Sequence, residues 1–288
     1  MTDVLVIDRR DALEDFVREA VRVSRIGVDT EFVRDRHYFP RAGLIQIAAG
    51  DLTGLVDPVA LDDLEPLEAL LFDPDVEKIL HAGRQDLELF VQLFDRVPAP
   101  LFDTQVAAAM LELADQIGYA ALAEELLQEP PGPALGRYDW LRRPLAAEAI
   151  RYAAEDVAHL AAMRDILGSR LEQAHKAGTF AGAMRDAVEA DYYRPRPDNA
   201  WRRVRQSRRM NGDSLSRLKR LAEWRERQAM HEDRPRQWLV RDGALATIAR
   251  RAPSSLAEMA EVRDLPAGAR RRYGPAMLTA MAGGEETG

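Results

Sequence analysis

The sequence of 288 residues contains no cysteine, and this absence excludes several kinds of chemistry at once. Without thiols the chain cannot form disulfides, bind zinc through thiolates or use a cysteine nucleophile. It also lacks an apolar run of about 18 residues, so no transmembrane helix is expected. The N-terminus, MTDVLVIDRRDALEDF, carries acids early and lacks the basic-then-apolar order of a signal peptide. We therefore expect a cytoplasmic protein.

Charge is distributed unevenly along the chain. Residues 1–190 hold 19 Lys and Arg against 35 Asp and Glu, whereas residues 191–288 hold 21 against 13. An acidic first part joined to an arginine-rich second part suggests that the second part binds a polyanion. The alternative is that these arginines lie on solvated helix faces and have no partner.

Alternating strand and helix patterns predict an α/β domain over residues 1–190. Asp103 is placed to cap one of its helices, and Gly50-Asp51 suits a hairpin loop. Short apolar runs predict strands at 4–8, 26–32, 43–49, 54–57, 77–82 and 100–103, with the strand at 26–32 central. Apolar residues at helical spacing predict helices over 10–22, 64–71, 85–94, 104–113, 119–128 and 146–173.

The last third of the chain has a different pattern. Residues 191–199, DYYRPRPDN, hold two prolines and few aliphatic side chains, which is typical of a linker. A small all-α domain is expected over 200–282, and residues 283–288 are expected to be frayed. Its predicted helices cover 200–210, 214–230, 243–251, 254–260 and 267–282.

Asp29 and Glu31 lie two residues apart within the apolar run IGVDTEF. In a strand, side chains i and i+2 share a face, so both carboxylates point the same way. Two like charges in a buried strand are costly unless a partner such as a divalent cation offsets them. The alternative is a solvated edge strand with two ordinary surface acids.

Two further acids lie in segments that could reach the same place. Asp86 falls in the first turn of a predicted helix, where the helix dipole favours a carboxylate, and this alone can explain it. Tyr152 and Asp156 are four residues apart and share one face of the longest predicted helix. A Tyr–Asp hydrogen bond that faces solvent is the alternative for this pair.

The four acids suggest a site when they are taken together. A cluster of Asp29, Glu31, Asp86 and Asp156 can hold two divalent cations about 3.5–4 Å apart. Hard oxygen ligands, without cysteine and without paired histidines, favour Mg²⁺ or Mn²⁺ over zinc. Such a pair of ions best supports in-line attack of water on a phosphodiester.

These segments resemble the DEDD superfamily of 3′–5′ exonucleases and, within it, the ribonuclease D family. VDTEF matches the first motif, HAGRQDLELF the second and YAAEDVAHL the third, and their order and spacing make the set specific. The resemblance spans nearly the whole chain and implies a ribonuclease H-like mixed sheet flanked by helices, an α/β fold, followed by a small all-α HRDC-type domain. Further matches are the DW-x-x-RPL element at Asp139, Trp140, Arg143, Pro144 and Leu145, and the HRDC-like run at Leu218, Leu221, Trp224 and Arg225.

The resemblance also implies roles for individual residues. Tyr152 matches the tyrosine subclass, since the histidine subclass places its base where this chain has Arg151. We expect Tyr152 to orient the attacking water, because a phenol with a pKa near 10 is a poor base at neutral pH. His159 matches no family role and is expected to be a packing residue. The acids that match the ligands of two Mg²⁺ or Mn²⁺ ions are Asp29, Glu31, Asp86 and Asp156.

The function that the resemblance implies is a metal-dependent 3′–5′ exoribonuclease that releases nucleoside 5′-monophosphates, as in transfer RNA 3′-end processing. The expected partner is RNA, with a nucleic-acid-binding helical domain, no membrane and a monomeric chain. One alternative is a DNA exonuclease, because no residue decides whether the 2′-OH is contacted. The other is a catalytically silent nucleic-acid-binding scaffold, although such decay should have removed at least one acid. Phe32, Tyr38, Phe39 or Tyr138 could stack a terminal base or simply pack.

Two features depart from the family pattern. Bacterial ribonuclease D commonly carries a lysine and small hydroxyl residues just before the DW element, where this chain reads PPGPALGRYDW. Arg137 is the expected substitute for that contact. In addition, some members have two HRDC domains and this chain has room for one, so a weaker grip on substrate is expected.

Overall fold

The computed structural model describes residues 3–129, 132, 135 and 138–283. The chain forms two compact units, the first made of Met1–Val33 and Arg41–Arg194 and the second of Arg34–Pro40 and Pro195–Gly288. The second unit begins within the linker predicted at 191–199. The sequence did not predict that the short segment Arg34–Pro40 groups with the second unit.

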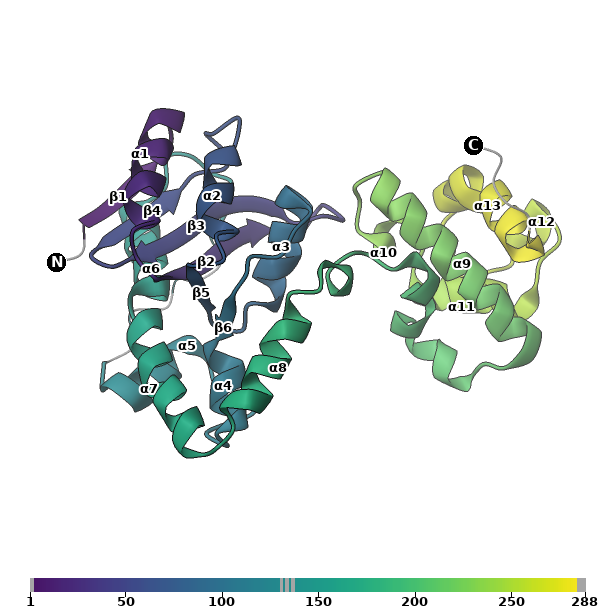
Figure 1. Ribbon diagram of the computed structural model, residues 1–288. Helices are drawn as coiled ribbons and strands as arrows, with labels where there is room; N and C mark the ends of the chain where they lie inside the picture. Colours follow the sequence, from purple (N-terminus) through teal and green to yellow (C-terminus); the bar gives the residue numbers. More distant parts are fainter. Residues whose placement is uncertain (1–2, 130–131, 133–134, 136–137, 284–288) are drawn as a thin grey trace. The chain divides into compact units, whose positions relative to one another are not determined.

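A six-stranded mixed sheet forms the centre of the first unit (Figure 1). Its antiparallel pairs are β2 (Arg25–Val33) with β3 (Arg41–Ala49) and β3 with β4 (Leu52–Val56), and the other neighbouring strands run parallel. The predicted strands and the hairpin at Gly50 are confirmed. VDTEF lies inside the sheet, in β2 between β3 and β5, but the middle strand of the antiparallel set is β3 and not the predicted VDTEF strand. In spatial order the strands are β1 (Asp3–Ile7), β4 (Leu52–Val56), β3 (Arg41–Ala49), β2 (Arg25–Val33), β5 (Glu77–Leu80) and β6 (Leu101–Asp103).

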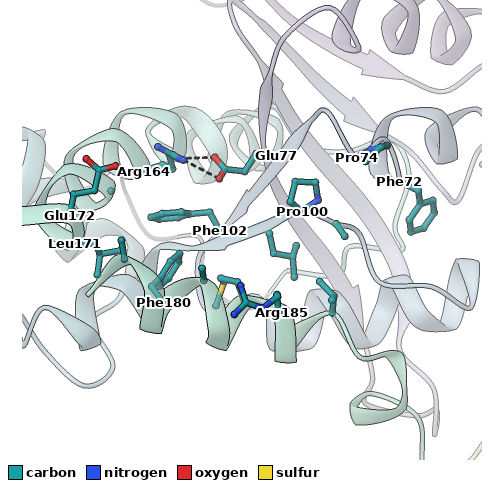
Figure 2. Close-up of a pocket in the computed structure, with 17 residues that line it drawn as sticks. Phe72, Pro74, Glu77, Pro100, Phe102, Arg164, Leu171, Glu172, Phe180 and Arg185 are labelled. Atoms are coloured by element: carbon teal, nitrogen blue, oxygen red, sulfur yellow. Dashed lines mark hydrogen bonds and ion pairs between the residues drawn. The ribbon is translucent and has the colours of Figure 1, made fainter. Parts of the chain in front are cut away.

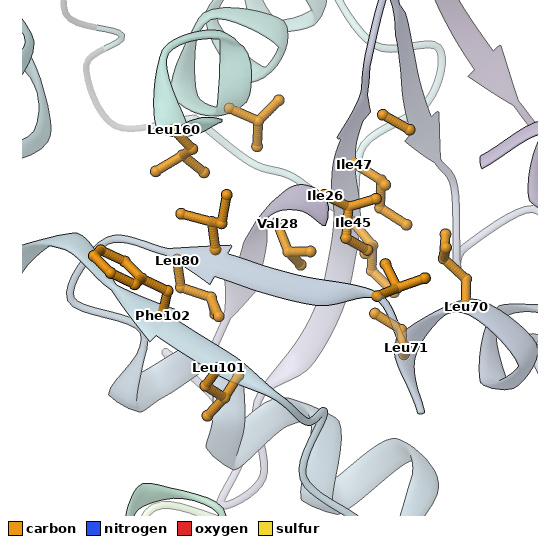
Figure 3. Close-up of a cluster of buried hydrophobic side chains, with 14 of the residues drawn as sticks. Ile26, Val28, Ile45, Ile47, Leu70, Leu71, Leu80, Leu101, Phe102 and Leu160 are labelled. Carbon is orange, nitrogen blue, oxygen red and sulfur yellow. The ribbon is translucent and has the colours of Figure 1, made fainter. Parts of the chain in front are cut away.

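Strand β2 is held in the sheet by buried aliphatic side chains. Ile26 and Val28 are almost completely buried and lie in one cluster with Ile45 and Ile47 of the neighbouring strand β3 (Figure 3). Gly27 lets a helix approach closely, because a Cβ at this position would lie 3.1 Å from the side chain of Leu160. The apolar packing of β2 therefore fixes the backbone that carries Asp29 and Glu31.

Helices α1 (Arg10–Ala20) and α6 (Ala147–Ala158) cover opposite faces of the sheet (Figure 1). Phe16 of α1 packs against Gly54 on one face, whereas the next residue, Leu55, packs with Ala149 and Ala153 of α6 on the other. The helices of this unit are α1 (Arg10–Ala20), α2 (Glu68–Leu71) after the 3₁₀ turn η1 (Glu65–Leu67), α3 (Arg84–Phe94), α4 (Thr104–Met110), α5 (Tyr119–Leu127), α6 (Ala147–Ala158), α7 (Leu160–Gln173) and α8 (Ala177–Ala187), followed by the turn η2 (Ala190–Tyr192).

The single helix predicted over 146–173 is wrong, because the chain forms two helices that meet at His159. The Tyr119 hydroxyl donates a hydrogen bond to the Glu155 carbonyl at 2.7 Å and accepts one from the His159 N–H at 3.1 Å. A side chain that inserts between residues i and i+4 in this way interrupts the helical hydrogen-bond ladder. The break therefore comes from a residue far away in the sequence.

The second unit is helical apart from its turns and connecting segments. The helix predicted over 200–210 is wrong, since two 3₁₀ stretches occur there, separated by Val204, whose backbone is extended and whose side chain is fully buried. Within the predicted frayed tail, residues 284–288 lie outside the described part of the chain. The elements are η3 (Pro197–Arg203), η4 (Arg205–Arg209), α9 (Gly212–His231), α10 (Arg236–Leu239), α11 (Asp242–Arg251), α12 (Leu256–Met259) and α13 (Ala267–Ala282).

Helix α9 forms the core of this unit. Leu218, Leu221 and Trp224 are buried along one side of it. Arg225 is completely buried, pairs with Asp242 at 2.8 Å and donates a hydrogen bond to the Val240 carbonyl at 2.7 Å. Within the described ranges, no helix of either unit has the length and apolar composition that crossing a membrane requires.

The segment Arg34–Pro40 completes the second unit through hydrogen bonds with α9 and the turn after it. The Tyr38 hydroxyl donates to the buried Glu226 carboxylate at 2.7 Å. The Asp233 carboxylate accepts from the peptide N–H groups of Tyr38 and Phe39, each at 3.1 Å, and its Oδ2 lies 2.9 Å from His37 Nδ1. These contacts tie a segment that follows β2 in sequence to the helical unit.

Candidate active site

Strand β2 presents two carboxylates from the middle of the sheet. Asp29 and Glu31 are half-buried, and the residue between them, Thr30, is buried. The pairing of β2 with β5 extends only over Arg25–Gly27. Beyond Gly27, the edge of β2 on that side is not paired with β5, and Thr30 hydrogen-bonds instead to the start of α3.

Asp86 lies in the first turn of α3 and is almost completely buried. Its carboxylate accepts a hydrogen bond from the Thr30 hydroxyl and another from the Thr30 backbone. Thr30 therefore links the third acid to the strand that carries the first two. This contact could not be predicted from the sequence, because a threonine between two acids can have many other roles.

A second carboxylate fixes the turn that leads into α3. Asp103 accepts hydrogen bonds from the N–H groups of Ala82 at 3.2 Å and Gly83 at 2.9 Å, the two residues just before the helix. It also caps α4, as predicted, by accepting from Gln105 at 2.9 Å and Val106 at 3.2 Å. The hydrogen bonds to Asp103 thus fix the backbone at the start of α3 and hence the position of Asp86.

Helix α6 contributes the remaining two predicted residues. Ala149, Ala153 and Val157 form its buried face, which leaves Tyr152 and Asp156 half-buried beside it. The Tyr152 hydroxyl donates a hydrogen bond to the Asp156 carboxylate. This is the i, i+4 contact that the sequence spacing predicts.

The electrostatics show that the four acids are neighbours. Burial, followed by the charges of Asp86 and Asp156 and then of Glu31, raises the pKa of Asp29 well above its usual range. Burial and the charges of Asp156 and Asp86 raise the pKa of Glu31 to about 8. Because the charges of Asp86 and Asp156 act on both Asp29 and Glu31, acids from a strand and two helices lie in one electrostatic cluster.

The other two acids are shifted mainly by burial. Burial raises the pKa of Asp86 to about 6, although the hydrogen bond from Thr30 opposes the shift. Burial raises the pKa of Asp156 to about 7, against the hydrogen bond from Tyr152. Burial and the nearby charges of Asp156, Glu31 and Asp29 raise the pKa of Tyr152, so its hydroxyl stays protonated at neutral pH.

The residues fit divalent cations by their chemistry. All four donors are carboxylates, the hard ligands that Mg²⁺ and Mn²⁺ prefer, and their mutual repulsion is what a bound cation would relieve. Over the described ranges, no three His, Asp or Glu side chains already converge as ligands around one point. The acids are thus close enough to repel one another without forming a closed set of ligands.

The DW-x-x-RPL element supports the face of the sheet next to α6. Arg143 forms a two-point ion pair with the buried Asp57, with both distances 2.5 Å, and donates hydrogen bonds to the carbonyls of Gly43 at 2.7 Å and Trp140 at 2.8 Å. The Trp140 ring lies 6.3 Å from that of Tyr152. This element therefore positions the Trp140 ring beside Tyr152. Arg137, the predicted substitute contact, lies outside the described residues.

Two of the residues discussed in the sequence analysis, Tyr138 and His159, form contacts within the protein itself. The Tyr138 hydroxyl accepts a hydrogen bond from the Ala146 N–H at 2.9 Å, and its ring packs on Trp140 at 4.8 Å. His159 lies at the junction of α6 and α7, where Tyr119 takes up its peptide N–H. Tyr119 had not been predicted, since its contacts join residues 36 and 40 positions apart.

An apolar pocket lies elsewhere in the first unit. It encloses about 660 Å³ beside β6 and α8, and none of the four acids lines it (Figure 2). Phe102 and Phe180 pack within it with their centroids 4.6 Å apart, and Arg164 pairs with Glu77 at 2.6 Å. It is separate from the acidic cluster.

Comparison with known proteins identifies both units. Residues 4–172 match the 3′–5′ exonuclease family, and residues 214–281 match the HRDC domain. Ribonuclease D of Gluconacetobacter diazotrophicus is 39% identical over 282 residues, which are 97% of this chain and 72% of that protein. Ribonuclease D of Escherichia coli K12 is 36% identical over 88% of this chain and 68% of that protein.

Solved structures show the same likeness. The crystal structure of Escherichia coli RNase D, described as an exoribonuclease involved in structured RNA processing, matches with a TM-score of 0.89 and 33% identity over 98% of this chain and 75% of that one. The catalytic core of RRP6 from Trypanosoma brucei shares the fold, with a TM-score of 0.73 and 21% identity over 98% of this chain and 80% of that one. The predicted α/β fold with a following helical domain is therefore confirmed.

Proposed function

Because the chain belongs to the ribonuclease D family of 3′–5′ exoribonucleases, we propose that it hydrolyses RNA from the 3′ end with two divalent cations held by Asp29, Glu31, Asp86 and Asp156. The observation that carries the proposal is the gathering of four carboxylates from β2, α3 and α6, in which Thr30 links Asp86 to β2 and the charges of Asp86 and Asp156 raise the pKa of both Asp29 and Glu31. The structure of a neighbour, NrnC of Brucella melitensis with bound Mg²⁺, supports the choice of Mg²⁺ or Mn²⁺.

Bound divalent cations would supply positive charge for the phosphodiester oxygens and for the attacking water. The chain's own part is to hold Asp29 and Glu31 on a rigid strand and to bring Asp86 and Asp156 to it from two helices. Tyr152 keeps its proton and orients the water through its hydroxyl. Hydrolysis adds the water oxygen to phosphorus and breaks the bond to the 3′ oxygen, which takes the proton. The products are a nucleoside 5′-monophosphate and an RNA one nucleotide shorter.

The proposed substrates are structured RNAs with a 3′ extension, transfer RNA precursors among them. Phosphate contacts carry no sequence information, so an enzyme that removes one terminal nucleotide at a time can act on many sequences. The basic second unit supports RNA binding, as its family match does. We propose that the chain acts as a monomer, which light scattering on the purified protein tests.

The test is digestion of a 5′-labelled single-stranded RNA with Mg²⁺ or Mn²⁺. We expect a ladder that shortens from the 3′ end, abolished by Asp29→Asn and strongly slowed by Tyr152→Phe. Asp62→Asn, at an exposed acid of the same unit, is the matched control and should digest like the wild type. Calorimetric titration with Mn²⁺ should give two ions per chain, and fewer in Asp29→Asn.

The alternatives give different results. If the wild-type protein degrades DNA and leaves RNA intact, the assignment of the catalytic site is supported and the choice of RNA as substrate is refuted. Binding of both without cleavage of either would show a catalytically silent scaffold. Cleavage that persists in Asp29→Asn would refute the assignment of the acids.

A further inference from the structure

A hollow of about 550 Å³ lies within the second unit, between the segment Arg234–Arg241 and the start of α13. Trp238 lines it, and 55% of this side chain is exposed, although tryptophan is usually largely buried. The peptide N–H of Trp238 donates to the Pro235 carbonyl at 2.8 Å in the short helix α10, which fixes the backbone that carries the ring. The indole face is therefore presented by a fixed backbone and is accessible to a ligand.

Arginines surround this ring. Arg241 lines the hollow, is exposed and has no ion-pair or hydrogen-bond partner for its side chain among the residues that the structure describes. Arg234 and Arg272 also line it, and both pair with Glu232, at 3.7 Å and 3.0 Å. Three guanidinium groups against one carboxylate leave the hollow with positive charge, which suits an anionic ligand.

The first turn of α13 supplies a further anion-binding feature. Pro266, Gly268 and Ala269 line the hollow, no side chain caps the helix, and its first turn holds no acid. The first backbone N–H groups of a helix have no acceptor within it, and the helix dipole favours negative charge there. A Cβ added at Gly268 would meet nothing within 4 Å, so a ligand can approach the backbone closely.

We infer that this hollow binds one nucleotide of a single-stranded RNA, with the base stacked on Trp238 and the phosphate against Arg241, Arg272 and the first turn of α13. An unpaired base offers the free face that stacking on an indole requires, and a duplex does not. An acidic peptide would use the arginines and leave the indole unused. The inference rests on the proposed function for its choice of RNA as the ligand.

Binding by the full-length chain tests the inference. Fluorescence anisotropy with a 5′-labelled 20-nucleotide oligoadenylate in EDTA measures the Kd without cleavage. We expect Trp238→Ala to weaken binding about tenfold, the usual order for one lost stacking contact, and Trp238→Phe to weaken it less. Arg241→Ala should lower the slope of log Kd against log salt by about 0.7, because one phosphate contact is lost.

Arg263→Ala is the matched control, since Arg263 is an exposed arginine of the same unit outside the hollow. It should leave the salt slope at the wild-type value. Thermal melting of all variants should coincide, because Trp238 and Arg241 are exposed. Unchanged RNA affinity in Trp238→Ala, or the same loss in Arg263→Ala as in Arg241→Ala, would overturn the inference.

Hydrolysis of a diribonucleotide separates this inference from the proposed function. Trp238→Ala should cleave the dinucleotide at the wild-type rate and degrade the 20-mer more slowly at low substrate concentration. If the wild type cleaves neither RNA but binds the 20-mer through Trp238, the proposed function is refuted and nucleotide binding by the hollow is supported. If Trp238→Ala slows hydrolysis of the dinucleotide and of the 20-mer equally, the substitution acts through the catalytic centre and the inference is overturned.

Discussion

The Tyr119 hydroxyl lies 2.7 Å from the Glu155 carbonyl oxygen, and it accepts the N–H that this carbonyl would otherwise receive from His159. Replacement of Tyr119 by Phe leaves a carbonyl and an N–H without their partner at the junction of α6 and α7. We expect the free energy of unfolding to fall by about 1–3 kcal/mol, the cost of unmet polar groups in a half-buried place. Thermal or urea unfolding measures the change.

Tyr192→Phe serves as the control for this change, because 59% of the Tyr192 side chain is exposed. It should unfold like the wild type. Unaltered stability of Tyr119→Phe would mean that Glu155 and His159 bond directly once the hydroxyl is gone, and that α6 and α7 then form one helix.

The acidic cluster predicts that the metal-free protein loses stability as the pH rises. In the unfolded chain these carboxylates titrate near pH 4, whereas burial raises the pKa of Asp86 to about 6 and of Asp156 to about 7, and burial with neighbouring charges raises that of Glu31 to about 8. The folded state therefore binds more protons between about pH 4 and 8, and the free energy of unfolding falls over this window. Melting temperatures in EDTA across this range test it.

Divalent cations should reverse this trend, because they bind the deprotonated carboxylates. We expect the rise in melting temperature caused by Mg²⁺ or Mn²⁺ to grow from pH 5 to pH 8. Burial lowers the pKa of His81, which has the opposite pH dependence, so the wild type should be compared with Asp29→Asn at each pH. A difference between these two proteins that does not vary with pH would contradict the coupling of the acids.

Arg143→Lys should destabilise the protein although it conserves the charge. Lysine cannot reproduce the two-point pair with Asp57 together with the hydrogen bonds to the carbonyls of Gly43 and Trp140. Since Asp57 is buried, we expect a loss of about 2–4 kcal/mol in the free energy of unfolding and a lower hydrolysis rate. Chemical denaturation measures the stability. Arg142→Lys, at the exposed neighbouring arginine, should change neither quantity.

Two glycines should respond in opposite ways to alanine. A Cβ at Gly43 would lie 2.6 Å from Trp140 Cβ and 2.8 Å from its carbonyl oxygen, so Gly43→Ala must push the DW element away from β3. We expect a loss of about 1–3 kcal/mol, typical of overpacking. Gly178 in α8 has nothing within 4 Å, so Gly178→Ala should stabilise the helix by up to about 1 kcal/mol. Melting curves of both variants check the contrast.

The features that were predicted correctly from the sequence are those set by local patterns. The alternating apolar runs located the six strands, and the position of Asp103 after a short strand predicted its capping of α4. Tyr152 and Asp156 form the hydrogen bond that their spacing predicts. The four acids could be proposed as one cluster from their motifs, although the end of the helix that carries Asp156 was predicted wrongly.

The features that were missed depend on contacts between distant residues. The break at His159 depends on a tyrosine hydroxyl 40 positions earlier in the sequence, and helical periodicity carries no sign of it. The 3₁₀ stretches near Val204 arise because this side chain is buried in the helical core while its backbone is extended. The link from Thr30 to Asp86 likewise forms only after α3 has been placed.

The hydrogen bonds of Tyr38 and Phe39 within the second unit mean that this unit is not one continuous piece of chain. A truncation after Arg194 would remove the partners of an internal segment as well as a C-terminal domain. A clone that begins at Pro195 would express a helical unit without seven of its residues, with the Glu226 and Asp233 carboxylates deprived of these donors. Exchange of this unit between relatives by a single crossover would therefore transfer only part of it, and a faithful chimera must include residues 34–40 with the C-terminal portion.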